Sequence, residues 1–295
     1  MGTNSTRLLV ADVEGGRITA EVERLLTITR LGDGVDASGR LSEEAMGRVE
    51  RCVAGYADRA RELGAERPLA VATSAVRDAA NGRDFLQRLE SRSGVRTRIL
   101  SGEQEARTTL RGVASGRELG EPVVVCDIGG GSTELIAGHG EDVAFAISLD
   151  MGCVRMSERH LADDPPPAHA IAALRAEAGR MLPDDVPDGT LIGVAGTVTT
   201  LATIDLGLDR EIPERIDGHV LARDTVEEEL RRLAAMPLEQ RRQVRGLMPE
   251  RAPTIVAGAA ILAELMARLG ADALTVSERD ILHGAALKAA AEPES

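Results

Sequence analysis

Apolar residues that alternate, or that recur at helical spacing, divide the first part of the chain into strands and helices. Thr6 to Glu14 is typical of a strand, and Arg17 to Thr29 of one or two more. From Ser42 onward, apolar residues at steps of three and four predict an amphipathic helix that ends at Gly64. A short buried strand follows at Leu69 to Thr73. Helices at 75–80, 83–92 and 103–115 and a strand at 95–100 complete an α/β pattern.

A polar segment from Gly116 to Pro122 breaks regular structure and is the predicted domain boundary. It separates an N-terminal domain, residues 1–116, from a C-terminal domain, residues 122–295. After it, Val123 to Asp127, Thr133 to Ala137 and Val143 to Leu149 read as three successive strands of a β-meander. The remaining expected elements are helices at 168–182, 196–204, 225–235, 254–269 and 281–290 and strands at 191–195 and 273–276.

Composition narrows the possible functions. The 295 residues carry 48 acidic and 35 basic side chains, a net charge of −13, and 1% aromatic residues. A non-specific nucleic-acid binder needs a basic excess and stacking rings, so we expect no nucleic-acid partner. The length predicts about two domains. The acidic balance predicts long-range repulsion of polyanions.

The cysteines and the apolar runs indicate the compartment. Cys52, Cys126 and Cys153 form an odd, sparse set without metal-ligand spacing, which is typical of reduced thiols in the cytoplasm. The N-terminus lacks the pattern of a signal peptide. The longest uncharged run, Gly189 to Ile204, is too short to span a bilayer. We therefore expect a soluble cytoplasmic protein with no membrane partner.

A short internal repeat links the two predicted domains. Gly2 to Leu9 can be laid on Gly129 to Ile136 with Gly, Ser, Thr and Leu in register. Each copy is a turn of small residues that enters a strand, which suggests two similar domains, although chance also remains open for so short a match. The second copy follows Asp127, whereas the equivalent place in the first copy lies before Met1. We therefore expect that the first strand is truncated and that the chain as given starts several residues late.

The most informative motif runs from Asp127 to Glu134. Gly129–Gly131 allow a tight turn whose exposed N–H groups can cradle phosphate oxygens, and Ser132 and Thr133 add hydroxyl donors. The two carboxylates offer hard oxygen ligands for Mg²⁺. The motif is neither a dinucleotide fingerprint nor a Walker A loop, because a strand follows and no lysine is present. A glycine-rich hairpin without a ligand is the alternative.

Three further stretches offer polar groups after strands. Glu105 lies in the first turn of a helix, where it is either a functional carboxylate or a charge that compensates the helix dipole. Arg77 is either a phosphate clamp or a partner of Asp78 or another acid. Gly196 and Thr197 open a helix and either present N–H groups to an anion or form a close-packed turn. For the scattered histidines, solvated or structural roles fit better than catalysis.

The ordered set of motifs is more specific than any member. It comprises Gly2-Thr3-Asn4-Ser5, Thr73-Ser74-Ala75-Val76-Arg77, Ser101-Gly102-Glu103-Gln104-Glu105-Ala106, Asp127 to Glu134, Met151-Gly152-Cys153-Val154 and Gly196-Thr197. With this set the whole chain resembles the exopolyphosphatase / guanosine pentaphosphate phosphohydrolase (Ppx/GppA) family, in its short two-domain form. The resemblance implies an α/β fold of two ribonuclease-H-like domains, as in the actin, Hsp70 and sugar-kinase superfamily, facing a central cleft.

The resemblance also implies roles for individual residues. Glu105 would be the general base on the attacking water, and Asp127 and Glu134 would support metal and water. The phosphate would be held by Asn4, Ser5, Arg77, Gly130, Gly131, Ser132, Thr133, Gly196 and Thr197. The implied cofactor is Mg²⁺, with a monovalent cation such as K⁺ as a further candidate, and the implied assembly is a homodimer.

The chain departs from the family pattern in two places. The acid of the first loop is missing, which puts metal binding by the first domain in doubt. His283 stands where the family more often has an acid before the glycine. The expected function is hydrolysis of the terminal phosphate of inorganic polyphosphate. Hydrolysis of guanosine pentaphosphate, phosphotransfer from ATP, and phosphate binding by a regulator without turnover are the alternatives. The shortage of aromatic rings, which leaves none to stack on guanine, weakly favours polyphosphate.

Overall fold

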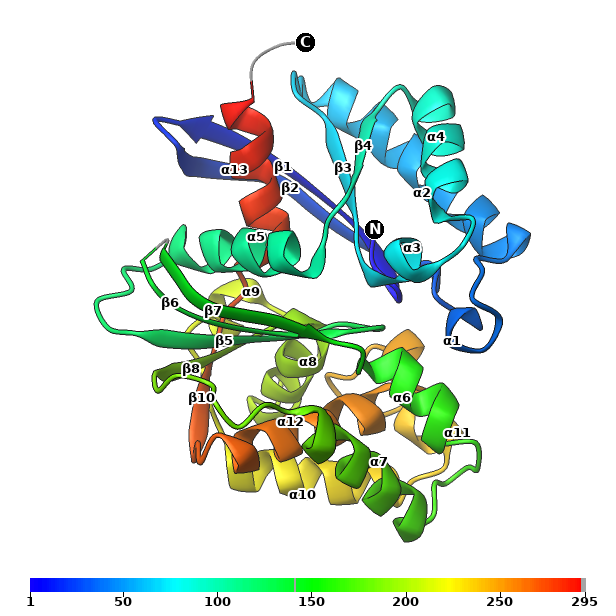
Figure 1. Ribbon diagram of the computed structural model, residues 1–295, viewed down its shortest axis with the longest axis vertical. Helices are drawn as coiled ribbons and strands as arrows, with labels where there is room; N and C mark the ends of the chain where they lie inside the picture. The colour runs from blue at the N-terminus through cyan, green and yellow to red at the C-terminus, as the bar shows by residue number, and fades with distance from the viewer. Residues whose placement is uncertain (141, 293–295) are drawn as a thin grey trace. The chain divides into compact units, whose positions relative to one another are not determined.

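The computed structural model describes residues 1–140 and 142–292, and the chain divides into two compact units (Figure 1). Unit 1 comprises Met1–Glu118 together with the segment from Arg279 onward, and unit 2 comprises Leu119–Glu278. The units succeed one another within the polar segment 116–122. The prediction that the second domain runs to the C-terminus is wrong, because the last helix returns to unit 1.

Unit 1 contains two separate two-stranded sheets, β1 antiparallel to β2 and β3 parallel to β4. Its strands are β1 (Ser5–Glu14), β2 (Arg17–Ile28), β3 (Leu69–Ala72) and β4 (Arg96–Ile99). Its helices are α1 (Val35–Ser38), α2 (Glu43–Glu62), α3 (Ser74–Asp78), α4 (Gly82–Ser93), α5 (Gly102–Ala114) and α13 (Ile281–Ala291).

Close helix packing explains why α13 belongs to unit 1. The helix contacts α5, β1 and β3, and Figure 1 shows it in red beside the blue β1–β2 hairpin. A Cβ at Gly112 of α5 would lie 1.8 Å from the carbonyl oxygen of Asp280, and one at Gly284 would lie 1.9 Å from that of Thr108. Two glycines thus let the helix backbones approach more closely than any side chain allows.

Local signals define the two helices that the sequence predicted best in unit 1. The Ser42 hydroxyl accepts a hydrogen bond from the N–H of Ala45 and caps α2, whose apolar stripe is buried. Ser101 and Gln104 form a reciprocal capping box at the start of α5. This capping fixes where α5 begins and therefore where the residues of its first turn lie.

Unit 2 is built on one six-stranded sheet in the order β7-β6-β5-β8-β10-β9. Its strands are β5 (Val123–Ile128), β6 (Thr133–His139), β7 (Asp142–Leu149), β8 (Thr190–Val194), β9 (Val220–Ala222) and β10 (Ala273–Val276). The first three form the predicted antiparallel meander, β5 runs parallel to β8, and β8 runs parallel to β10. A meander followed by parallel strands confirms the ribonuclease-H-like prediction for this unit. β5 is buried along its whole length, and it has a neighbouring strand on each side.

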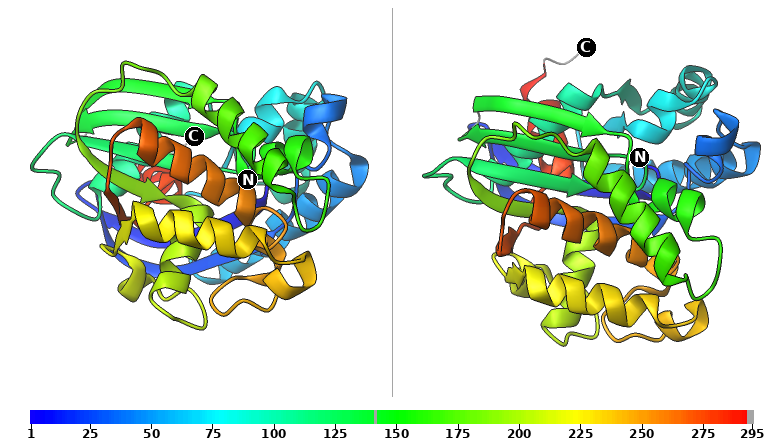
Figure 2. Two further views of the ribbon diagram at one scale, coloured as in Figure 1. Left: turned by 90° about the horizontal axis from the view of Figure 1, so that it is seen from below. Right: turned by 60° about the horizontal axis from the view of Figure 1, so that its bottom comes forward.

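The helices of unit 2 pack around α12, which contacts α6, α7, α8 and α10. Figure 2 shows α12 in orange beside the yellow α10 and the green α7. The helices are α6 (Cys153–His160), α7 (Ala168–Met181), α8 (Ala195–Asp205), α9 (Pro213–Ile216), α10 (Arg223–Ala234), α11 (Leu238–Arg241) and α12 (Ile255–Arg268), with a 3₁₀ turn η1 (Pro249–Arg251). The sequence analysis missed α1, α6, α9, α11, η1 and β9, which have eight residues or fewer.

Two other expectations concern the surroundings of the protein. Cys52, Cys126 and Cys153 are free thiols. Among the residues that the structure describes, no helix has the length and apolar character needed to cross a membrane.

Candidate active-site residues

The backbone of the glycine-rich turn between β5 and β6 is hydrogen-bonded to the start of α6. The N–H of Gly129 donates to the carbonyl of Ser132 (3.0 Å), and the first turn of α6 donates from Cys153 to Gly129 (2.9 Å) and from Val154 to Gly130 (2.8 Å). Within residues 1–140 and 142–292, no backbone carbonyl accepts a hydrogen bond from the N–H groups of Gly130 or Gly131. The turn thus leaves these N–H groups without a backbone acceptor, and their predicted role as donors to an anion stays a prediction.

Two groups that hold this turn received no role from the sequence. The Arg155 guanidinium donates from Nε to the carbonyl of Gly131 (2.8 Å). A Cβ at Gly152 would lie 2.4 Å from the carbonyl carbon of Gly130, so only glycine lets α6 begin this close. Gly152 belonged to a recognised motif, but its role became visible only when α6 was seen against the turn.

The two carboxylates of the motif face each other across the strand pair. Asp127 on β5 is directly opposite Glu134 on β6, so both side chains project from the same face of the sheet. Asp127 is 7% exposed and Glu134 is 1% exposed. The Ser148 hydroxyl on β7 donates to Oε1 of Glu134 (2.7 Å). Thr133, which was predicted to hold phosphate, is buried, and its hydroxyl donates to the Met151 carbonyl.

The Gly196–Thr197 turn lies at the same edge of the sheet. Asp127 and Val194 are paired in the parallel ladder, so β5 and β8 end together. Ala195 has a positive φ of 69°, a conformation that costs a non-glycine residue about 1 kcal/mol. The carbonyl of Gly196 accepts a hydrogen bond from Nη1 of Arg251 (2.6 Å). The structure thus brings this turn, the glycine-rich turn and both carboxylates to one edge of unit 2.

Arg251 is the main residue of unit 2 that the sequence analysis missed. Besides Gly196, its Nη1 donates to the Thr200 hydroxyl and to Glu211, each at 2.8 Å. Glu211 also accepts a hydrogen bond from Thr199 (3.0 Å). This network rigidifies the start of α8. No sequence signal points to it, because its members are far apart in the chain and follow no known spacing.

Unit 1 contributes a buried carboxylate. Glu105 in the first turn of α5 is 6% exposed, and its Oε2 accepts a hydrogen bond from Nη1 of Arg77 on α3 (2.9 Å). Arg77 also donates to the carbonyl of Leu100 (3.2 Å) and lies 3.7 Å from Asp78. Burial raises the pKa of Glu105 above the ordinary carboxyl value, and Arg77 opposes this. Both residues thus belong to one ion pair, which helix-dipole compensation alone would not require.

The turn from Gly2 to Ser5, which begins the first copy of the internal repeat, resembles the glycine-rich turn of unit 2. The N–H of Gly2 donates to the carbonyl of Ser5 (2.9 Å), which matches the bond from Gly129 to Ser132 (3.0 Å). The Thr3 hydroxyl lies 3.0 Å from that of Ser74, so the turn adjoins the start of α3. The backbone therefore supports the repeat. Asn4 and Ser5 are half-buried, and their phosphate roles stay predictions.

His283, the departure noted in the sequence, is a structural residue. It is fully buried in unit 1, its Nδ1 accepts a hydrogen bond from the N–H of Asp280 (3.2 Å), and its Nε2 lies 3.2 Å from Glu21. The carboxyl of Asp280 caps α13 and pairs with Arg7 on β1. The histidine thus helps to fix the start of α13 on the β1–β2 hairpin.

The sheet of unit 2, with a glycine-rich turn beside two carboxylates, defines the class as an α/β protein of the ribonuclease-H-like fold. Comparison with known proteins gives the family: residues 9–291 match the profile of the Ppx/GppA phosphatase family. The chain belongs to this family.

Its relatives match along nearly its whole length. Exopolyphosphatase 2 of Mycobacterium tuberculosis is 38% identical over 98% of this chain and 96% of its own. The guanosine-5′-triphosphate,3′-diphosphate pyrophosphatase of Vibrio atlanticus is 33% identical over 97% of this chain but only 57% of its own. The crystal structure of the Aquifex aeolicus Ppx/GppA enzyme has a TM-score of 0.83 and 30% identity, covering 98% of this chain and 97% of that one.

Proposed function

We propose that the protein is an exopolyphosphatase that hydrolyses the terminal phosphate of inorganic polyphosphate. The observation that carries the proposal is the Gly130–Gly131 turn of unit 2, whose N–H groups donate to no backbone carbonyl of the described residues and which adjoins the strands that carry Asp127 and Glu134. The choice of polyphosphate is supported by the mycobacterial exopolyphosphatase 2, which this chain matches over nearly the full length of both proteins.

The two units supply different parts of the chemistry. Hydrolysis of a phosphoanhydride needs a positioned water and neutralisation of charge on the phosphate oxygens. Glu105 takes the proton of the attacking water, and the Arg77 hydrogen bond fixes the orientation of its carboxylate. The N–H groups of the Gly130–Gly131 turn stabilise charge on the phosphate. The net charge of −13 disfavours a broad basic track, but a local cradle of backbone donors needs none.

The donor set of unit 2 fits Mg²⁺. This ion prefers oxygen ligands and is usually held by one or two protein carboxylates together with substrate phosphates and water. Asp127 and Glu134 provide two carboxylates on one face of the sheet. In the described residues, no group of three or more His, Cys, Asp or Glu side chains gathers as a complete protein cage. A bound Mg²⁺ would neutralise phosphate charge beside the glycine-rich turn.

Hydrolysis of guanosine pentaphosphate is the second candidate, and the Vibrio relative is the observation that favours it. The scarcity of aromatic residues argues against this candidate, because they amount to 1% of the chain and offer little for stacking on guanine. Cytoplasmic location is supported by the three free cysteines. The monovalent cation and the homodimer stay predictions.

A side-by-side assay tests the proposal. Orthophosphate release is measured from polyphosphate and from guanosine pentaphosphate at equal concentrations of phosphoanhydride ends, with Mg²⁺ and with a chelator. The proposal expects turnover on polyphosphate that the chelator abolishes and Mg²⁺ restores. Turnover on the nucleotide alone would replace it with the second candidate. Polyphosphate binding without release from either substrate would favour the phosphate-binding regulator.

A further inference from the structure

Two carbonyl groups of the glycine-rich turn in unit 2 accept hydrogen bonds from the backbone of α6. The N–H of Cys153 donates to the Gly129 carbonyl (2.9 Å). The Gly130 carbonyl accepts from the N–H groups of Val154 (2.8 Å) and Arg155 (3.1 Å). The first N–H groups of a helix are commonly available to an anion, but here the turn occupies them. An anion at this turn must therefore be bound by the turn itself.

The third carbonyl of the turn, that of Gly131, is held by a side chain. In the part of the chain that the structure describes, no backbone N–H donates to it. It accepts a hydrogen bond from Nε of Arg155 instead (2.8 Å). The side chain of Arg155 thus supplies the donor that the backbone of α6 does not supply at this position.

These hydrogen bonds fix the direction of three N–H groups. In a trans peptide the C=O and N–H groups point in opposite directions. The carbonyls of Gly129–Gly131 are directed toward the start of α6, so the N–H groups of the same peptides, at residues 130–132, are directed away from it. No backbone carbonyl within residues 1–140 and 142–292 accepts from these three N–H groups. Successive N–H groups on one side of a turn form a concavity that suits an anion.

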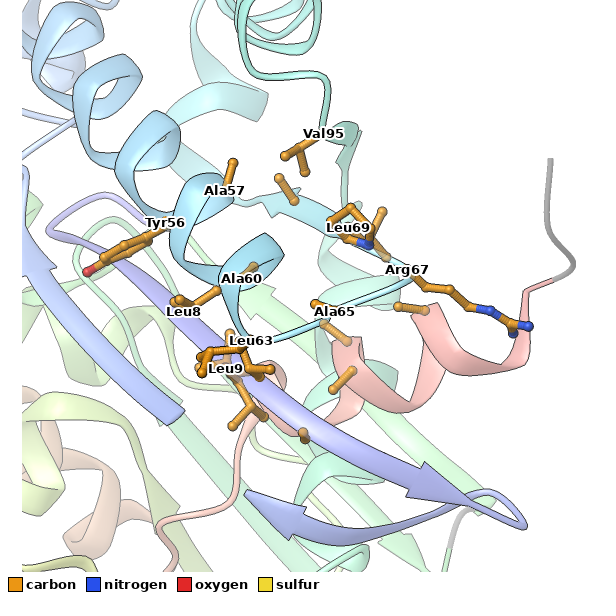
Figure 3. Close-up of a pocket in the computed structure, with 18 of the residues that line it drawn as sticks. Leu8, Leu9, Tyr56, Ala57, Ala60, Leu63, Ala65, Arg67, Leu69 and Val95 are labelled. Carbon is orange, nitrogen blue, oxygen red and sulfur yellow. The ribbon is translucent and has the colours of Figure 1, made fainter. Parts of the chain in front are cut away.

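The turn that matches it in unit 1 adjoins the groove of Figure 3, because Met1 and Thr6, on either side of that turn, both line the groove. In the internal repeat, Thr3 and Asn4 occupy the positions of Gly130–Gly131. Their carbonyls therefore show how the same two positions are held in the other copy.

Backbone donors alone hold these two carbonyls in unit 1. The Thr3 carbonyl accepts from the N–H of Gly32 (2.9 Å). The Asn4 carbonyl accepts from the N–H groups of Thr29 (3.1 Å) and Arg30 (2.9 Å). A fixed carbonyl at the third position is thus common to both copies. In unit 2 this function depends on the side chain of Arg155, which a substitution can remove.

The peptide between Gly131 and Ser132 has a particular need to be held. Glycine on its amino side adopts many backbone conformations at little cost, so the peptide plane can rotate. Rotation would turn the Ser132 N–H toward α6 and the Gly131 carbonyl toward the side where an anion would bind. A carbonyl oxygen there would repel a phosphate, and one of the three donors would be lost.

We infer that Arg155 is a positioning residue of the phosphate site. Its Nε–H fixes the peptide between Gly131 and Ser132, so that the N–H groups of residues 130–132 donate together to one phosphate group. The residue acts through the direction of this peptide and not through its positive charge. The inference rests on the proposed function for the identity of the anion.

Two substitutions separate the hydrogen bond from the charge. In Arg155→Gln, the amide nitrogen stands as many bonds from the backbone as the arginine Nε, so a neutral donor to the Gly131 carbonyl is kept. In Arg155→Lys the charge is kept, but a methylene group takes the place of Nε. Arg159→Lys is the control, because Arg159 lies on the same helix and pairs with Glu177.

Amide NMR of the whole protein, titrated with orthophosphate, measures the direction of the peptide. In the wild type, the amide protons of residues 130–132 should move downfield together as they donate to the phosphate. In Arg155→Lys, the shift at Ser132 should shrink at least about threefold, while the shifts at Gly130 and Gly131 persist. Arg155→Gln and Arg159→Lys should keep all three shifts. General loosening of α6 would instead reduce the three shifts alike.

Hydrolysis of polyphosphate gives a second readout. KM should rise about tenfold in Arg155→Lys with a smaller change in kcat, and Arg155→Gln should recover most of the loss. Equal losses in the two variants, a Ser132 shift that survives in Arg155→Lys, or a Ser132 amide that orthophosphate does not move in the wild type overturns the inference. A wild type that shows all three shifts but releases no orthophosphate from polyphosphate refutes the proposed function and leaves the role of Arg155 standing.

Discussion

The two units begin from the same turn but place it in different sheets. In unit 2 the turn connects β5 to β6, and β5 lies buried at the centre of six strands. In unit 1 the matching turn follows Met1 and enters β1, whose sheet has only two strands. The comparison teaches that turns with the same local hydrogen bonds can enter sheets of different size.

The chemistry is also divided between the units. Unit 2 carries the N–H donors and the carboxylates Asp127 and Glu134, which suit an anion and a cation. Unit 1 carries Glu105, a buried carboxylate held by Arg77. If this division is correct, changes in unit 1 should alter proton transfer, whereas changes at the glycine-rich turn should alter substrate binding.

The largest effect is expected from Glu105→Gln. Loss of the general base should lower kcat about a thousandfold, with little change in polyphosphate binding. Glu103→Gln is the matched control, because Glu103 lies in the same turn of α5 but is exposed and pairs with Arg107 on the same helix. Orthophosphate release and equilibrium binding of polyphosphate measure the two effects. An unchanged rate in the Glu105→Gln variant would show that Glu105 of unit 1 is not the general base.

The next effect concerns the pair that anchors α13 in unit 1. Asp280 is 3% exposed and pairs with Arg7, which is 21% exposed. Asp280→Asn should cost about 3 kcal/mol of unfolding free energy, because it removes the carboxylate charge that faces a largely buried guanidinium. Asp272, which is 91% exposed, pairs with Arg223, and Asp272→Asn should cost less than about 1 kcal/mol. Denaturant unfolding measures both, and equal costs would refute the anchoring role.

The same pair predicts a dependence of stability on pH. Burial would raise the pKa of Asp280, but Arg7, His283 and Arg24 outweigh it and hold the pKa well below its usual range. A lowered carboxyl pKa contributes stability that is complete above the unfolded value of about 4 and is lost as the pH falls further. The wild type should therefore lose more stability than Asp280→Asn between about pH 4 and pH 2.

A smaller effect is expected where α6 meets the glycine-rich turn of unit 2. The Cβ in Gly152→Ala would lie 2.4 Å from Gly130, so the turn must shift, at a cost of about 2 kcal/mol. KM for polyphosphate should rise about tenfold with a smaller change in kcat. Gly55→Ala is the control, since its Cβ would meet nothing within 4 Å in the helix α2. An unchanged KM for Gly152→Ala would separate the turn from substrate binding.

The smallest effect sharpens the role of Arg77. Because burial raises the pKa of Glu105 and Arg77 opposes the shift, kcat/KM should decline on the acid side at a pH above the ordinary carboxyl value. Arg77→Met removes the opposing charge, so the acid limb should move to higher pH. The pH–rate profiles of both proteins test this. A limb that moves downward would show that Arg77 does not act on Glu105.

Local patterns were sufficient for much of the fold. The residues of the apolar stripe of α2 are close together in the sequence, and so are the capping residues of α5. The sequence alone therefore predicted both helices. The three apolar strands after residue 122 likewise predicted the meander. The missed elements have three to eight residues each, which is too short for a period to be established from the sequence.

Long-range contacts decided the rest. The amino acids between Ile281 and Ala291 determine a helix, but tertiary contacts such as the fit of Gly284 against Thr108 place it in unit 1. The sequence offered Glu105 and Arg77 as candidates, yet their hydrogen bond joins residues 28 positions apart.

The contact of Arg251 with Gly196 spans 55 positions and left no trace in any motif. Residue types and spacing thus determined which groups are available for phosphate chemistry. Which of them are buried, paired or aimed at an anion was decided by the tertiary structure, because burial and hydrogen bonding depend on neighbours that are distant in the chain.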